Sequence, residues 1–118
     1  MTTLNTMSCQ PVSSGDRVDG AALSASIQTL RQNESIDIEA GTLGEEVGAI
    51  LSGRIDVVAA GEHYVLCAGE AIVIPAGEAR RFTCLTERGE LYRVTVRAYS
   101  SEYNNACNNA HTDVPEQA

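Results

Sequence analysis

The sequence contains no lysine. All eight of its basic residues are arginine, and sixteen aspartates and glutamates give the chain of 118 residues a net charge of −8. The absence of lysine excludes mechanisms that depend on a Schiff base or an amine nucleophile. The acidic balance also disfavours binding to nucleic acid, because the chain repels phosphate groups.

Long apolar runs are absent as well. No stretch approaches the length needed to cross a bilayer, and residues 1–7 lack the basic and apolar regions of an export signal. We therefore expect a cytoplasmic protein that does not bind a membrane. No CxxC pair occurs, so free thiols are expected in a reducing compartment at all four cysteines, Cys9, Cys67, Cys84 and Cys107.

The length fits one domain with a modest core. Residues 1–22 are rich in Ser, Thr, Gly and Asp, which predicts a flexible N-terminal arm with room for one short strand. Residues 23–98 form the body of the domain. Residues 99–118 have little apolar content and predict a polar, disordered tail.

The body shows strand patterns and no helical period. Polar and apolar residues alternate in short runs, and glycine lies in nearly every turn between them. Strands are expected at 26–30, 35–39, 47–51, 54–58, 63–66, 71–74, 80–85 and 91–96, with a polar turn at 86–89. Short strands at intervals of roughly ten residues indicate an all-β sandwich or barrel.

Two stretches resemble the motifs of a known family. Residues 69–80, GEAIVIPAGEAR, resemble the second cupin motif, in which a Gly, five residues and Pro-x-Gly are followed after two residues by a His. Glu46, six residues and Gly53 match the second half of the first cupin motif. The resemblance covers residues 27–96 and implies a single-domain cupin, a jelly-roll β-barrel of two antiparallel sheets around one cavity.

The residues that usually hold a metal in cupins are mostly replaced. The two His positions of the first motif fall on Ala40 and Thr42, or with the longer spacing on Glu39 and Gly41. The third His position is Arg80. Because such a site needs about three imidazoles and a carboxylate, we expect no metal and no cofactor.

The two histidines do not restore that site. His63 is expected to point outward from its strand, because Tyr64 shares a face with apolar neighbours. His111 lies in the polar tail. Arg81 is expected on the outside too, since it alternates with Arg80.

Glu46 and Arg80 both project into the barrel if the resemblance holds. A buried carboxylate is costly unless a cation or several donors face it. In one alternative the two residues pair as an internal strut in place of the metal. In the other, Arg80 faces an open cavity and binds the carboxylate or phosphate of a small ligand.

Other residues are candidates for the same cavity. Phe82 and Cys84 share the strand face of Arg80, Phe82 as core and Cys84 as a thiol with no activating histidine. Tyr64 and Tyr92 could line the cavity with a ring and a hydroxyl. The candidate ligand-binding set is thus Arg80, Glu46, Tyr64, Tyr92, Thr42, Phe82 and Cys84.

Three functions remain open at this point. The first is a metal-free cupin that binds a small, anionic molecule in its barrel. The second is a metal-independent isomerase, epimerase or cyclase in which Glu46 or a tyrosine acts as acid or base. The third is a structural or regulatory module with a filled barrel. A homodimer is expected in each case, from the family and from the need to protect strand edges, with the arm as a candidate for crossing to the partner.

Overall fold

The computed structural model describes residues 8–41 and 43–97, and these residues contain strands and turns but no helix. The strands, in chain order, are β1 (Arg17–Asp19), β2 (Leu23–Arg31), β3 (Ser35–Ile38), β4 (Glu46–Ser52), β5 (Arg54–Ala59), β6 (Glu62–Cys67), β7 (Ala71–Ile74), β8 (Arg80–Cys84) and β9 (Arg88–Val96). The all-β prediction is confirmed. Nothing in the described segments has the length and apolarity of a membrane-crossing helix.

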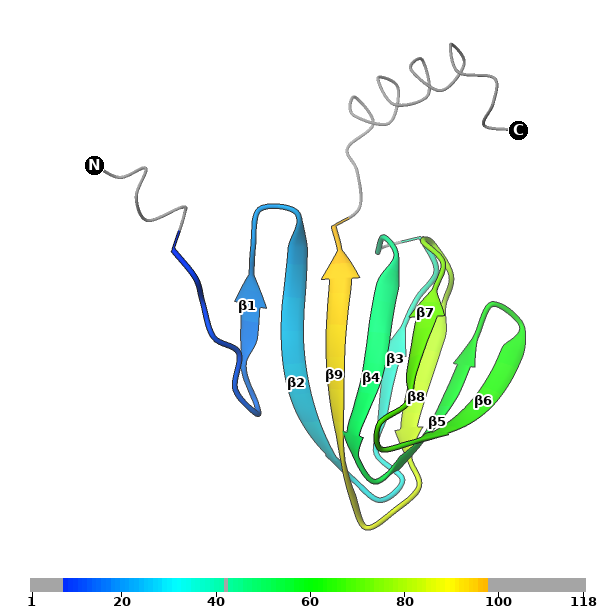
Figure 1. Cartoon of the computed structure of the whole chain (residues 1–118). Helices are drawn as coiled ribbons and strands as arrows, with labels where there is room; N and C mark the ends of the chain where they lie inside the picture. Colours follow the sequence, from blue (N-terminus) through cyan, green and yellow to red (C-terminus); the bar gives the residue numbers. More distant parts are fainter. Residues whose placement is uncertain (1–7, 42, 98–118) are drawn as a thin grey trace.

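The strands form two antiparallel sheets that face each other (Figure 1). The five-stranded sheet has the order β1-β2-β9-β4-β7, and the four-stranded sheet has the order β3-β8-β5-β6. Strand β1 is the outer edge of the larger sheet and pairs only with β2 among the described strands. Residues 17–19 of the segment expected as a loose arm are therefore paired, while the tail from residue 99 lies outside the described residues.

Strand positions follow the sequence prediction, and two strands begin three residues earlier than expected. Strand β2 begins at Leu23 rather than at residue 26, and β9 begins at Arg88 rather than at residue 91. The two strands pair along their whole length, from Leu23 opposite Val96 to Arg31 opposite Arg88. This pairing incorporates Arg88 and Gly89, half of the polar turn predicted at 86–89, into the ladder.

The core lies between the sheets and is built from both of them. Its most buried apolar side chains are each at most 1% exposed: Ile50, Ile55, Val57, Ile74, Phe82 and Leu91. Burying one side chain of this kind contributes about 1.5–3 kcal/mol to stability. This apolar core occupies one part of the interior and leaves the rest to polar side chains.

Strand β2 inverts the usual pattern of a sheet that faces a core. Over residues 24–28 its inward residues are polar: Ser24 and Ser26 lie opposite Thr95 and Arg93, and Gln28 accepts a hydrogen bond from Arg93. Its outward residues alternate with these and are apolar: Leu23, Ala25 and Ile27. Alternating side chains of a strand point to opposite faces, so this end of the larger sheet directs polar groups inward and apolar groups outward, while its other end supplies Ile50, Ile74 and Leu91 to the core.

Gly53 alone connects β4 to β5, and it cannot be replaced without strain. Its φ is +78°, and a Cβ there would lie 2.5 Å from the carbonyl oxygen of Arg88 and 2.6 Å from Oγ1 of Thr86. Gly69 has a similar φ of +91° but faces open space. A side chain at Gly69 would meet backbone strain alone, whereas a side chain at Gly53 would meet both backbone strain and steric overlap.

We expect Gly69→Ala to cost about 1–2 kcal/mol, the price of a left-handed residue. Gly53→Ala should cost roughly 1–3 kcal/mol more, because backbone atoms must also move apart. Urea unfolding followed by circular dichroism measures both values. Equal losses in the two variants would contradict the steric argument.

Candidate functional site

A charged cluster joins the two sheets inside the molecule. Glu46 of β4 is 1% exposed and Arg80 of β8 is 2% exposed. Nη1 of Arg80 donates to Oε1 of Glu46 at 2.6 Å. Arg93 of β9 donates to the same carboxylate through Nε to Oε2, and through Nη2 to Oε1 at 3.2 Å. One carboxylate therefore lies between two guanidinium groups.

Arg80 pairs with Glu46 inside the barrel, as in the first of the two alternatives drawn from the sequence. Besides Glu46 it binds the protein backbone, with Nε and Nη2 donating to the carbonyl of Glu78 at 3.0 and 2.7 Å. Nη2 also donates to the carbonyl of Pro75 at 3.3 Å. Because these partners belong to the protein and the side chain is buried, little of Arg80 is left to anchor a ligand.

The residues at this position do not fit a metal ion. Arg80 places a permanent cation where a neutral imidazole would be needed, and both oxygens of Glu46 are bound by guanidinium groups. Ala40 and Gly41 offer no side-chain ligand. Within residues 8–41 and 43–97, no group of three or more His, Cys, Asp or Glu side chains could hold a metal.

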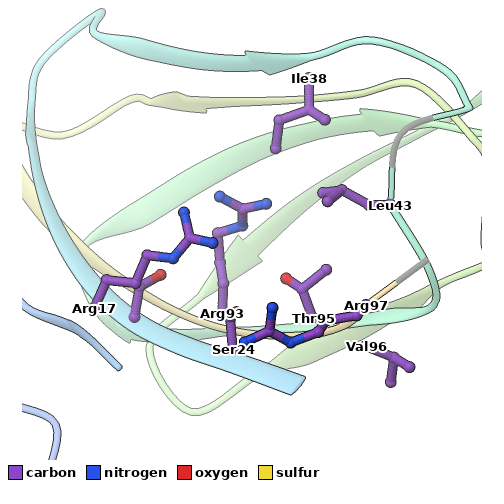
Figure 2. Close-up of a pocket in the computed structure, with 9 residues that line it drawn as sticks. Arg17, Ser24, Ile38, Leu43, Arg93, Thr95, Val96 and Arg97 are labelled. Carbon is purple, nitrogen blue, oxygen red and sulfur yellow. The ribbon is translucent and has the colours of Figure 1, made fainter. Parts of the chain in front are cut away.

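A pocket adjoins this cluster on the side of β1, β2 and β9. Its volume is about 530 Å³, and three arginines line it: Arg17, Arg93 and Arg97. Figure 2 shows the guanidinium groups of Arg17 and Arg93 pointing into the same space. The side chain of Arg17 is 69% exposed, so the pocket reaches the surface there, whereas Arg93 is 12% exposed and lies deep within it.

The rest of the lining is hydroxylic on one side and apolar on the other. Ser24, Ser26 and Thr95 supply hydroxyl groups from β2 and β9. Ile38 and Leu43 close the opposite side and point toward the arginines (Figure 2). A small molecule with one anionic end and one apolar side would match this lining.

Asp19 places a carboxylate beside the pocket. It accepts hydrogen bonds from the hydroxyl of Ser24 at 2.6 Å and from Nε of Arg17 at 3.0 Å. The Ser24 hydroxyl and then Arg17 hold the pKa of Asp19 below its ordinary value. The charge of Arg97 lowers the pKa of Asp19 further, by a smaller effect. Asp19 therefore stays charged near neutral pH and compensates part of the positive charge of Arg17.

Two arginines keep donors free for a further partner. Arg17 uses Nε on Asp19, and Arg97 uses Nη2 on the carbonyl of Gly20 at 2.7 Å. Their remaining N–H groups have no partner among the described residues. With Arg93, Arg80, Glu46 and Asp19 included, the region carries four guanidinium groups and two carboxylates, an excess of positive charge in an acidic protein.

The structure separates the other residues predicted for the cavity. Phe82 and Cys84 are fully buried in the core, where Phe82 lies 5.5 Å below the guanidinium of Arg93 and Cys84 donates to the carbonyl of Thr86. Tyr64 is 44% exposed on the edge strand β6, and its hydroxyl donates to Glu62 at 2.8 Å. Thr42 lies outside the described residues.

Tyr92 is on the opposite side of its sheet from the cavity, which corrects the sequence-based placement. Leu91, Arg93 and Thr95 point inward along β9, so Tyr92 points outward, where it lies opposite Ile27 and Ala49. His63 and Arg81 do point outward as predicted. His63 pairs with Asp56, and Arg81 makes two hydrogen bonds to Asp37 at 2.8 and 3.0 Å.

Sequence reasoning missed Arg93, Arg17 and Arg97, the three cations of the pocket. The alternation Leu91-x-Arg93-x-Thr95 contains the signal for Arg93, because Leu91 is a core residue and Arg93 shares its face. No comparable signal exists for Arg17, since β1 has only three residues and no family motif covers it. Arg97 follows the last strand and is placed by tertiary structure alone.

We expect Glu46→Gln to destabilise the protein by about 3–5 kcal/mol, because two buried guanidinium groups lose their shared anion. Arg80→Met should cost less, since Glu46 keeps Arg93, and the double variant should recover part of the loss. Urea unfolding measures these differences in the free energy of unfolding, provided that the variants keep the m-value of the wild-type protein.

The exposed Asp37–Arg81 pair is the control for the buried cluster. Both side chains are more than half exposed, at 60% and 59%, so Asp37→Asn should change stability little. Equal effects of Asp37→Asn and Glu46→Gln would show that the buried cluster is not what stabilises the barrel.

Comparisons with known proteins agree with this architecture. The sequence model of the Cupin domain matches residues 27–96, whereas no curated protein matches the chain.

Among solved structures, a cupin protein from Bacteroides fragilis is similar at 22% identity and a TM-score of 0.62, and the match covers 79% of this chain and 86% of that protein. A conserved protein of unknown function from Streptococcus pyogenes is similar at 20% identity and a TM-score of 0.61, covering 75% and 82%. A cupin superfamily protein from Desulfitobacterium hafniense is similar at 16% identity and a TM-score of 0.61, covering 69% and 72%. Those structures share the fold, and the match of the family model over more than half of the chain shows that the chain belongs to the cupin family.

Proposed function

We propose that this cupin binds a small anionic molecule, a carboxylate or a phosphate, in the pocket that β1, β2 and β9 line on one side and Ile38 and Leu43 close on the other. The observation that carries the proposal is the convergence of Arg17, Arg93 and Arg97 on one cavity of about 530 Å³. Cavities of about 300–1,000 Å³ are typical of small-molecule sites. In a chain with a net charge of −8, such a gathering of cations favours an anionic ligand.

The chemistry of arginine supports an anchored anion. A guanidinium group offers parallel N–H donors that match carboxylate and phosphate oxygens, and the contact is stronger where water is partly excluded. Arg93 lies at the buried end, and Arg17 and Arg97 lie nearer the surface with free donors. In this arrangement Glu46 and Arg80 hold Arg93 in place, and the ligand is bound by the pocket arginines instead of Arg80.

Binding is favoured over the two other functions by specific observations. A pocket of this size disfavours a completely filled barrel. Both oxygens of Glu46 are occupied by guanidinium groups, which disfavours a role for it as a catalytic acid or base. The hydrogen bond to Glu62 raises the pKa of Tyr64 above its ordinary value. Tyr64 is therefore a poor base near neutral pH, and it is absent from the pocket lining.

Thermal shift and calorimetry with citrate, succinate and inorganic phosphate test the proposal. A ligand of the native state raises the melting temperature by mass action. We expect at least one of these probes to stabilise the protein at millimolar concentration. Arg17→Gln and Arg97→Gln should each weaken that binding by about tenfold, the value of one charge-assisted hydrogen bond.

Arg81→Gln is the matched control, because Arg81 lies on the outer face of the other sheet. It should leave the affinity unchanged. Arg80→Met should lower stability and preserve the affinity in the folded fraction. The proposal fails if no probe shifts the melting temperature, or if Arg81→Gln weakens binding as much as the two pocket variants do.

A further inference from the structure

The buried end of the pocket carries a positive charge that no described side chain balances. Glu46, Arg80 and Arg93, the inner cluster from here on, combine one carboxylate with two guanidinium groups and so have a net charge of +1. Their side chains are 0%, 1% and 12% exposed. Glu46 is the only buried carboxylate among the described residues. Because an unbalanced buried charge is strongly unfavourable, the inner cluster favours an added anion.

The surface end of the pocket repeats this composition. Arg17 donates to Asp19 at 3.0 Å, and the charge of Arg97 acts on the same carboxylate. Asp19, Arg17 and Arg97, the outer cluster from here on, again combine one carboxylate with two guanidinium groups and have a net charge of +1. Both arginines of this cluster are exposed. The outer cluster therefore favours a second negative charge near the surface.

One cavity connects the two clusters. Arg93 of the inner cluster and Arg17 and Arg97 of the outer cluster line the same pocket of about 530 Å³ (Figure 2). None of its described lining residues is acidic. Ile38 and Leu43 form an apolar side along this space. The pocket thus has an unbalanced positive charge at each of two depths and an apolar surface beside them.

We propose that the pocket binds a dicarboxylate, with one carboxylate on the inner cluster and the other on the outer cluster. The anion of the proposed function, on which this inference rests, is thereby narrowed to a diacid with an apolar spacer. Each carboxylate balances the charge of one cluster. The methylene groups between them pack on Ile38 and Leu43, which removes apolar area from water.

Two other classes of anion match the charges less well. A phosphate group holds both of its charges at one point, so it can balance one cluster and leaves the other without a partner. A monocarboxylate also balances one cluster only. A diacid separates its charges, and each carboxylate can accept parallel N–H donors from a guanidinium group. The placement of charge along the pocket therefore favours a diacid.

Each cluster keeps N–H donors for such a ligand. Arg93 donates to Glu46 through Nε and Nη2, and Nη1 makes a 3.5 Å hydrogen bond to Gln28. A guanidinium group has five N–H donors in total, so Arg93 keeps unused donors on both terminal nitrogens. Arg17 and Arg97 keep more, since the hydrogen bonds of each involve a single nitrogen. Because Glu46 already holds Arg93 in place, less entropy is lost when Arg93 binds a ligand.

Calorimetric titration with acids matched in carbon number tests the proposal near neutral pH, where carboxyl groups are ionised. The pairs are malonate and propionate, succinate and butyrate, glutarate and pentanoate, and adipate and hexanoate. In at least one pair the diacid should bind about tenfold more tightly than the monoacid, the effect of one added charge-assisted contact. Inorganic phosphate should bind more weakly than that diacid.

Arg97→Gln separates the two ends of the site. It should weaken the binding of the best diacid by about tenfold and leave the matched monoacid unchanged. The monoacid is expected at the inner cluster, where water is partly excluded and the contact is stronger. Arg97 is exposed and holds one backbone carbonyl, that of Gly20, so this variant should fold. Arg81→Gln, on the outer face of the other sheet, is the matched control and should leave both affinities unchanged.

The arginine Nε–H signals in nuclear magnetic resonance spectra of the wild-type protein locate each carboxylate without any variant. The monoacid should shift the signal of Arg93 and leave that of Arg97 in place. The diacid should shift both signals. The signal of Arg81 is the internal reference and should not move with either acid.

The possible results distinguish a failure of the dicarboxylate site from a failure of the proposed function. If no carboxylate and no phosphate binds, both are overturned. If anions bind but no diacid binds more tightly than its monoacid, or phosphate binds more tightly than every diacid, only the dicarboxylate site is overturned. It is also overturned if Arg97→Gln weakens both acids of a pair equally, or if the monoacid shifts Arg97 and not Arg93.

Discussion

The carboxylate of Glu46 is the point on which the interior of this barrel depends. It lies on the larger sheet and accepts hydrogen bonds from Arg80 of the smaller sheet and Arg93 of its own. A buried carboxylate with one partner removed is strongly unfavourable, and so is each buried guanidinium. The three groups therefore hold the two sheets in one relative position. Removing one member is therefore costly, although well-packed apolar residues in place of the whole cluster could stabilise the protein as much.

A charged interior changes what the neighbouring strands must present. Arg93 is buried beside Ser26 and Gln28 because polar neighbours lower the cost of desolvating a guanidinium. All buried side-chain nitrogens and oxygens in the described segments have a hydrogen-bond partner. The polar side of the sheet that surrounds Arg93 also lines the pocket. The anion site and the stabilising cluster are therefore two parts of one polar interior.

The sequence predicts the strand positions and the family. It also predicts the contact between Glu46 and Arg80, as one of two alternatives. Strand periodicity and the glycine spacing of the motifs depend on local rules that hold here. The pocket could not be predicted, because the hydrophobic rule for choosing the inward face fails where β2 and β9 line it. Along β9 the outward Tyr92, Val94 and Val96 are more apolar than the inward Arg93 and Thr95. The same inversion placed Tyr92 in the cavity and concealed Arg93.

Strand β1 is the least supported part of the pocket wall. Arg17 points into the pocket, whereas the next residue, Val18, points to the opposite side of the sheet. Three residues paired with a single neighbour give β1 little to hold it, and short edge strands are among the least stable parts of a sheet. Ordering a ligand contact before binding removes part of its entropic cost, so the pairing of β1 with β2 that holds Arg17 over the pocket favours anion binding there.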